Sequence, residues 1–358
     1  MTATTKRILV TGASGFIGGH ACEALVKTGA KVRAMVRKTS NVGQLAGTGV
    51  EICHADLSDP ASLQQACADV DTVVHTAAAV GSFGDWEHFH EVGVLGTERL
   101  IDAAHRRGVS RFIHVSSIAA YGLKDHRRRV DEDTPFDHAP QPWNHYVREK
   151  VMSEEVLWRA HEAQKIRATS LRPSVVVGAR DRNAVPRLVD LLRLPVTALP
   201  GRPDNHFPVV TIEDCVDAIV RSVENEAAIG RAYNVSGGRR ITIADFFALI
   251  AKHAQLPPPK LYLPTGLMLP ATGLLESAWK LLGKAGEPVA TRIAIVVSGY
   301  DYEIDCRRAQ RELGWSADGS YEAAIVAALE QPSETKHGLG TVASAGSAER
   351  SPAVAANH

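Results

Sequence analysis

Cysteine and net charge are both scarce in this sequence, and each scarcity excludes a class of protein. The 358 residues carry 40 basic and 40 acidic side chains, so there is no surplus of positive charge with which to bind nucleic acid. The five cysteines follow no metal-ligand spacing, which predicts reduced thiols rather than disulfides or a metal site. They are Cys22, Cys53, Cys67, Cys215 and Cys306.

Both ends of the chain lack apolar segments. Residues 1–7 are polar and pass directly into an apolar run, which does not fit a signal peptide, so we expect a cytoplasmic protein. Residues 332–358 are rich in serine, alanine and glycine and have no hydrophobic periodicity, so we expect a disordered tail there. The rest of the chain is long enough to bury a large core.

The most informative stretch is a glycine-rich turn at residues 11–18, Thr-Gly-Ala-Ser-Gly-Phe-Ile-Gly. An apolar run at 8–10 precedes it and an amphipathic pattern at 21–26 follows, which predicts a strand, a turn and a helix. Glycine tolerates a positive φ in the turn and lets the backbone approach a ligand closely. The start of the helix offers free N–H groups that suit a pyrophosphate, so this context indicates a dinucleotide site rather than an ordinary turn.

Strand and helix patterns alternate through the first half of the chain. Further strands are expected at 31–36, 50–54, 72–75, 111–115 and 168–171. Helical patterns lie between them, as at 62–68 and 96–107. Alternating units predict an α/β fold with a doubly wound parallel sheet of the Rossmann type, in which the ligand lies at the carboxyl ends of the strands.

The form Thr-Gly-x-x-Gly-x-x-Gly resembles the extended branch of the short-chain dehydrogenase/reductase superfamily, and the similarity continues over roughly residues 6–330. That branch includes nucleotide-sugar epimerases and dehydratases, dihydroflavonol reductases and 3β-hydroxysteroid dehydrogenases. The resemblance implies that several segments hold a nicotinamide cofactor. The residues concerned are Gly12, Ser14, Gly15, Phe16, Ile17 and Gly18 in the turn, Arg37, Lys38, Asp56, Leu57 and Ala77 after the next three strands, and Tyr146, Lys150, Pro173 and Val176 further on. For Asp56 an ordinary turn role stays open.

The end of the second expected strand bears on the choice of cofactor. A dehydrogenase that prefers NAD usually has an acid there for the adenosine ribose, and none occurs between residues 31 and 49. Arg37 and Lys38 would instead pair with a 2′-phosphate. We therefore expect NADP(H), with NAD and a plain solvated basic turn as the alternatives.

Three residues are expected to carry the chemistry. The run Tyr-Val-Arg-Glu-Lys at 146–150 resembles the Tyr-x-x-x-Lys motif of the family, whose two end residues share one helix face. The resemblance makes Tyr146 the acid or base, Lys150 the cation that tunes its pKa and holds the nicotinamide ribose, and Ser117 the donor to the substrate oxygen. Gly93 stands where the family usually has an asparagine, which puts a full proton relay in question without removing the acid or base.

Similarity to later elements of the family predicts how the chain is divided. We expect a dinucleotide-binding domain from residues 1–178 and, after a return crossing, from 206–236. A smaller C-terminal substrate lobe is expected from 179–205 and 237–331.

Two features of the expected lobe favour an apolar substrate. Phe207 stands where nucleotide-sugar enzymes of the family carry an arginine for the diphosphate, and a phenyl ring can instead pack against a ring system. Residues 265–282 are strongly apolar, which suits a hydrophobic alcohol or ketone, although an ordinary core helix explains them equally well. Pro270, Glu276 and Lys280 interrupt the stretch, so we do not expect it to span a membrane, and peripheral membrane contact stays open.

These features favour an oxidoreductase that transfers a hydride between NADP(H) and a bulky, largely apolar alcohol or ketone resembling a steroid or flavanonol. A nucleotide-sugar epimerase or dehydratase with tightly bound NAD is one alternative, and a non-catalytic cofactor-binding regulator is another. The expected partner is a small-molecule substrate. No metal and no nucleic acid are expected, and a homodimer is left open by analogy to the family.

Overall fold

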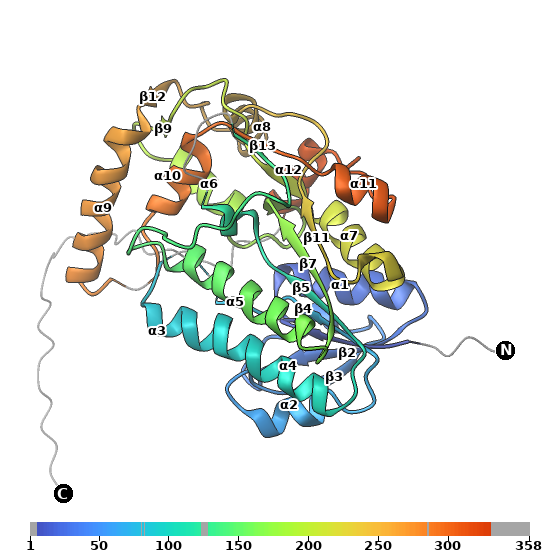
Figure 1. Ribbon diagram of the computed structural model, residues 1–358. Helices are drawn as coiled ribbons and strands as arrows, with labels where there is room; N and C mark the ends of the chain where they lie inside the picture. The colour runs from blue at the N-terminus through green and yellow to red at the C-terminus, as the bar shows by residue number, and fades with distance from the viewer. Residues whose placement is uncertain (1–5, 80, 82, 123–127, 285, 331–358) are drawn as a thin grey trace, which may run out of the picture.

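The computed structural model describes residues 6–79, 81, 83–122, 128–284 and 286–330 (Figure 1). The tail expected at 332–358 lies outside the described residues. A parallel sheet of seven strands, in the order β11-β7-β5-β4-β1-β2-β3, forms the centre of the fold. These strands are β1 (Arg7–Thr11), β2 (Lys31–Val36), β3 (Glu51–His54), β4 (Thr72–His75), β5 (Arg111–Val115), β7 (Arg167–Pro173) and β11 (Arg231–Val235). The order runs outward from β1 in both directions, so the doubly wound α/β fold is confirmed.

Helices cover both faces of the sheet. On one face lie α1 (Phe16–Lys27) and α7 (Ile212–Glu224), and on the other lie α2 (Pro60–Ala66), α4 (Gly96–Arg106) and α5 (His145–Glu162). Strand β1 shows why its apolar run is unbroken. Ile8 and Val10 pack with α1 and α7, whereas Leu9 packs with the other three helices. Successive side chains of a strand point to opposite faces, so both faces must be apolar when both are covered.

Most of the remaining described elements form a smaller part beyond the end of β7, and the described residues contain three two-stranded parallel sheets, β8–β10, β9–β12 and β6–β13. The strands are β6 (Arg128–Val130), β8 (Val175–Val177), β9 (Ala198–Pro200), β10 (Val209–Thr211), β12 (Leu261–Leu263) and β13 (Tyr302–Ile304). The helices of this part are α6 (Ala184–Leu192), α8 (Ile243–Ala254), α9 (Thr265–Leu281), α10 (Arg292–Gly299) and α12 (Tyr321–Leu329). Helix α11 (Arg307–Leu313) packs instead against β11 and α7 at the main sheet. Short helical segments elsewhere in the chain are η1 (Gly43–Leu45), α3 (Trp86–Phe89), η2 (His90–Leu95), η3 (Ile118–Tyr121) and η4 (Glu226–Ala228).

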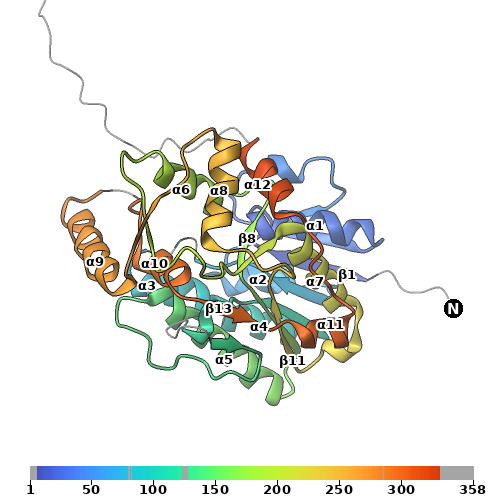
Figure 2. The ribbon, with the colours of Figure 1, turned by 90° about the horizontal axis from the view of Figure 1, so that it is seen from above.

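This smaller part has its own core, in which Phe246 and Phe247 of α8 pack with Ile325 of α12 and with the inner face of α6. Helices α9 and α10 pack against each other, and α9 projects from one side of the molecule in both ribbon views (Figures 1 and 2). The expected division of the chain into a dinucleotide-binding domain and a substrate lobe stays a prediction.

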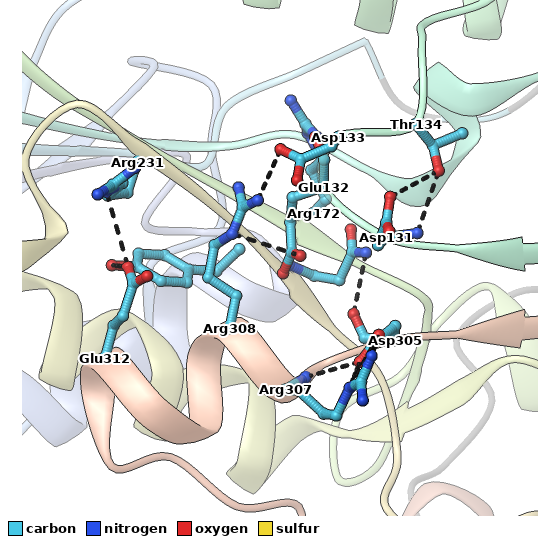
Figure 3. Close-up of polar contacts among 12 residues, drawn as sticks. Asp131, Glu132, Asp133, Thr134, Arg172, Arg231, Asp305, Arg307, Arg308 and Glu312 are labelled. Carbon is cyan, nitrogen blue, oxygen red and sulfur yellow. Dashed lines mark hydrogen bonds and ion pairs between the residues drawn. The ribbon is translucent and has the colours of Figure 1, made fainter.

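Ion pairs tie α11 to the chain between β6 and α5 (Figure 3). Arg308 of α11 lies 2.6 Å from Asp133 and 3.7 Å from Glu132. Glu132 also accepts the backbone N–H of Asn234 in β11 at 2.9 Å. These contacts anchor the loop at 131–133 to the edge of the main sheet, together with the pairing of β6 and β13.

A buried ion pair fixes α5 against the sheet. Arg172 of β7 donates from Nε to both carboxylate oxygens of Glu154, at 2.9 and 3.2 Å. The same guanidinium donates to the hydroxyl of Tyr121, at the end of η3, at 2.7 Å. Buried ion pairs require close geometry and further hydrogen bonds to offset their desolvation, and this one has both. One guanidinium thereby sets the relative positions of β7, α5 and η3.

Candidate functional site

The glycine-rich turn connects β1 to α1 through close contacts of its own backbone. Gly12 has a φ of +65°, and a Cβ added there would lie 2.9 Å from the backbone of Ala77. A Cβ added at Gly18 would lie 2.3 Å from the carbonyl oxygen of Gly12. A side chain would therefore collide with the backbone at both positions, and the positive φ of Gly12 is a second reason for glycine there. The N-cap of α1 is Gly15, which has no side chain to cap the first turn, so the N–H groups there can bind an anion.

A cavity of about 340 Å³ opens beside this turn, at the carboxyl ends of β1 to β4. Six of the residues that the sequence predicts to bind the cofactor line its wall: Gly12, Ser14, Gly15, Arg37, Asp56 and Leu57. The other residues predicted to bind the cofactor lie outside this wall in the described part of the chain. They are Phe16, Ile17, Gly18, Lys38, Ala77, Tyr146, Lys150, Pro173 and Val176. Their cofactor roles stay predictions.

Sequence reasoning missed several polar residues of the same wall, including Ser40, Ser58, His88 and Glu91. Ser40 lies two residues beyond Lys38 and Ser58 directly follows Leu57, both in turns at strand ends. A systematic reading of such turns could have found both. His88 comes from α3, which carries no motif, so no local signal pointed to it. Glu91 comes from η2, two residues before Gly93, and a closer reading of that family segment could have found it.

The cavity wall carries charge of both signs. Arg37 is exposed just after β2. Asp56, just after β3, accepts hydrogen bonds from the backbone N–H and the hydroxyl of Ser58 at 2.9 and 2.7 Å. These bonds hold the pKa of the Asp56 carboxyl below its usual range. Asp56 is thus a turn residue and part of the wall at once. A close glycine turn, a guanidinium and a carboxylate around one cavity fit a nucleotide with its phosphates.

Ser117 and Tyr146 lie on neighbouring elements. Ser117 follows β5 and is the N-cap of η3, where its hydroxyl oxygen accepts the backbone N–H of Ala119 at 3.1 Å. Tyr146 is half-buried in the first turn of α5 and packs against the cluster that contains Ala119 and Ala120. The structure therefore brings the segments of both hydroxyl groups together, as the sequence motif requires.

Lys150 lies one helical turn beyond Tyr146 and is 3% exposed. Its Nζ is 5.5 Å from the centroid of the Tyr146 ring and 3.4 Å from the carboxylate of Glu149. Burial by itself lowers the pKa of Lys150, but the Glu149 carboxylate and the Tyr146 phenol outweigh burial and raise it above its ordinary value. The ammonium beside Tyr146 is therefore charged.

A second cavity, of about 730 Å³, lies between the start of α5 and the helices α9 and α10. Its wall is mostly apolar and consists of Gly122, Gln141, Trp143, Asn144, Leu269, Pro270, Gly273, Leu274, Ser277, Arg292, Val296 and Tyr300. Arg292 is the charged member of this wall among the described residues. It is paired with the buried carboxylate of Glu276 at 2.6 Å and lies over the ring of Trp143.

Helix α9 is the apolar stretch expected from the sequence, and the core-helix alternative for it is wrong. The residues that α9 buries are Thr265, Thr272 and Glu276, whereas Leu267 and Leu281 are 60% and 88% exposed. Phe207 was expected to be free to pack against a substrate ring. It packs instead in the protein core, stacked on Phe246 with ring centroids 4.7 Å apart.

The geometry of the turn, the cavity beside it and the α5 motif agree with a comparison to known families. The NAD dependent epimerase/dehydratase family matches residues 8–236. The chain belongs to this family. Members of the NAD dependent epimerase/dehydratase family are NAD(P)-dependent oxidoreductases or epimerases of the extended short-chain dehydrogenase/reductase type, so the expected superfamily is confirmed.

Individual members of the family are similar to the chain over most of its length. It is 27% identical to the 2-alkyl-3-oxoalkanoate reductase of Shewanella oneidensis, over 90% of this chain and 85% of the relative. It is 31% identical to sterol demethylase protein B of Methylococcus capsulatus, over 86% of this chain and 92% of the relative. The structure of UDP-glucuronic acid 4-epimerase from Bacillus cereus in complex with NAD has the same fold, with a TM-score of 0.69, 24% identity, and coverage of 90% of this chain and 97% of that one.

The part of the chain that the structure describes contains no helix that is both long and apolar enough to cross a membrane.

We predict that Gly18→Ala lowers the melting temperature and weakens dinucleotide binding, because the new methyl group would collide with the Gly12 carbonyl oxygen. Overpacking of this kind costs about 1–3 kcal/mol. Thermal unfolding and NADP(H) titration measure both effects. Gly266→Ala in α9 is the matched control, since its Cβ meets nothing within 4 Å and alanine favours a helix. Equal melting temperatures for the two variants would contradict the prediction.

Proposed function

We propose that the protein is an NADP(H)-dependent oxidoreductase that acts on a bulky, largely apolar alcohol or ketone. The observation that carries this proposal is the mostly apolar cavity of about 730 Å³ whose wall includes Asn144, two residues before Tyr146. A cavity of this size accommodates a ring system or a long alkyl chain. Four of its residues are apolar or small positions of α9, the helix whose sequence suggested a hydrophobic substrate: Leu269, Pro270, Gly273 and Leu274.

The chemistry assigned to this chain is proton transfer and charge stabilisation. A bound nicotinamide supplies or accepts the hydride at the substrate carbon. Tyr146 gives its hydroxyl proton to the carbonyl oxygen in reduction and takes a proton from the alcohol in oxidation. The Lys150 ammonium favours the phenolate, and the Ser117 hydroxyl donates a hydrogen bond to the oxygen on which negative charge develops.

Arg37 supports NADP(H) as the cofactor. It is exposed, lines the cavity beside the glycine turn, and stands at the end of β2, where an acid would receive the ribose hydroxyls of NAD. A guanidinium at this place can bind a 2′-phosphate through two hydrogen bonds. The Asp56 carboxylate on the same wall adds a negative charge, but Ser58 donates two hydrogen bonds to it.

The names of the relatives support the apolar substrate class. The two reported relatives are named for a 2-alkyl-3-oxoalkanoate and for a sterol, and both substrates are largely hydrocarbon. The alternative of a nucleotide-sugar epimerase with bound NAD draws on the likeness to the Bacillus cereus enzyme. A sugar diphosphate needs cationic partners when it is partly buried. The cation of the larger cavity, Arg292, is already paired with Glu276, and this favours the oxidoreductase.

We expect the purified protein to consume NADPH when it is offered a steroid ketone, a flavanonol or a long-chain 3-oxo acid, and to require added cofactor for turnover. A dehydrogenase must release its cofactor in every cycle, whereas an epimerase keeps it bound. Loss of NADPH absorbance measures the reaction, and nucleotide sugars are the control substrates. Epimerisation of a nucleotide sugar by protein that carries tight NAD from purification would overturn the proposal, and so would failure to turn over any member of the panel.

Tyr146→Phe should reduce turnover by about 10²–10⁴-fold while leaving the dissociation constant for NADP(H) nearly unchanged, because only the phenol oxygen is lost. Lys150→Ala should damage both turnover and cofactor binding, since the ammonium is assigned to both. Steady-state kinetics and fluorescence titration of NADPH separate the two quantities. A phenylalanine variant that keeps more than a few per cent of the activity would remove Tyr146 from the mechanism.

Arg37→Asp should reverse or abolish the preference for NADP(H) over NAD(H), because the aspartate repels a 2′-phosphate and can accept the ribose hydroxyls instead. Titration with both cofactors gives the ratio of dissociation constants. Arg37→Gln serves as the control for loss of charge without its reversal, and it should lie between the wild type and the aspartate variant. If the wild type binds NAD(H) tenfold more tightly than NADP(H), the assignment of Arg37 is wrong.

A further inference from the structure

Glu149 is a buried carboxylate that the proposed mechanism does not use. It lies within the α5 motif, is 1% exposed, and places Oε2 3.4 Å from Nζ of Lys150. Lysine and glutamate are almost never fully buried unless they are paired, and here both are buried and adjacent in sequence. The carboxylate faces the interior between α5 and η2, since its side chain meets Gly93 of η2.

Gly93 leaves the space that Glu149 occupies. A Cβ added at Gly93 would lie 2.2 Å from Oε1 of Glu149 and 2.3 Å from its Cγ, which is closer than real Cβ atoms approach. The backbone gives no other reason for glycine, because Gly93 is not among the described glycines with a positive φ and lies inside the π-helical turn η2. The side chain of Glu149 therefore occupies the space that a side chain at position 93 would need.

We propose that Glu149 is a positioning residue for Lys150, and that position 93 is a glycine because only glycine leaves room for the Glu149 side chain. The carboxylate fills the volume that a side chain at position 93 would take, and it holds the ammonium against Tyr146. The sequence pattern put the proton relay in question because Gly93 replaces an asparagine, and the structure places a polar group from α5 at that position. The effect on catalysis rests on the proposed function, whereas the pairing of Gly93 with Glu149 does not.

The other charged and titratable groups around Lys150 come from three elements. Tyr146 and Glu154 lie on α5, His75 on β4 and His114 on β5. Burial lowers the pKa of His75 well below its ordinary value and that of His114 to about 3, so both rings are neutral. The Glu154 carboxylate is already bound to Arg172. Burial raises the pKa of Glu149, and the Lys150 ammonium opposes that rise, so each group of the pair favours the charged form of the other. Glu149 is thus the carboxylate that faces Lys150 most directly.

The pH dependence follows from charge balance within the coupled groups. Lys150 and Glu149 are coupled, because the Glu149 carboxylate raises the pKa of the buried Lys150 ammonium. Removing that carboxylate therefore lowers the pKa of Lys150, and the ammonium loses its proton at a lower pH. A neighbouring charge shifts a pKa by about 1–3 units at such distances. The Glu149→Gln variant should therefore lose reductase activity at a lower pH than the wild type.

The first experiment compares Glu149→Gln with Glu162→Gln, a change of the same kind at an exposed position of α5. We expect the alkaline limb of the kcat profile, and the alkaline loss of NADP(H) affinity, to move down by about one pH unit in Glu149→Gln alone. The affinity series needs no substrate, so it remains decisive if the proposed reaction is not found. Coincident profiles for the wild type and Glu149→Gln would overturn the positioning role.

The second experiment is a double-mutant cycle of Gly93→Ala and Glu149→Ala, read by thermal unfolding and NADP(H) titration. Gly93→Ala alone should lower the melting temperature, because its methyl group overlaps Glu149. The double variant should be no less stable than Glu149→Ala alone, since the methyl group then enters vacated space. Coupling between contacting residues gives such non-additive changes. Additive losses of melting temperature and affinity would show that the two residues do not share one space, and would overturn the proposal.

Discussion

The structure depends most on keeping one buried ammonium charged. Desolvation opposes a buried cation strongly, and Lys150 is almost wholly removed from solvent. Two features of α5 offset that cost, the carboxylate of Glu149 at 3.4 Å and the ring of Tyr146 below the ammonium. The two nearby histidines, on β4 and β5, are neutral, so they add no electrostatic repulsion to the cost of burying the ammonium. The charge of Lys150 therefore constrains how α5, η2 and the central strands pack together.

Much of the fold and part of the site could be predicted because their signals are local in the chain. The glycine turn joins a strand and a helix within twenty residues, and Tyr146 and Lys150 share a helix face whatever the rest of the fold is. Strand and helix periodicity was sufficient for the parallel sheet, since both faces of each strand are covered. Ser117 was predicted from the resemblance of residues 116–122 to the family, and its catalytic role stays a prediction.

What the sequence did not reveal depends on contacts between distant segments. Gly93 suggested only a missing asparagine, because nothing local says that η2 packs on α5 and that Glu149 fills the gap. His88 joins the cofactor cavity through the path of α3, which has no motif. Phe207 was expected at the substrate, but the packing of α8 turns it into the core. The leucines of α9 are divided between a cavity wall and open surface, a division that hydrophobicity alone does not determine.

The path of the chain through the main sheet also constrains how the protein is made. Strand β7 pairs with β5 on one side and with β11 on the other, and β11 is synthesised only after the chain has passed through β8, α6, β9 and β10 and returned along α7. Until then β7 presents an unpaired edge, which is a template for pairing with another chain. Parallel pairs between distant segments also form slowly. Folding on the ribosome must therefore wait for residues near 235, and a chain stopped before that point would carry an aggregation-prone edge.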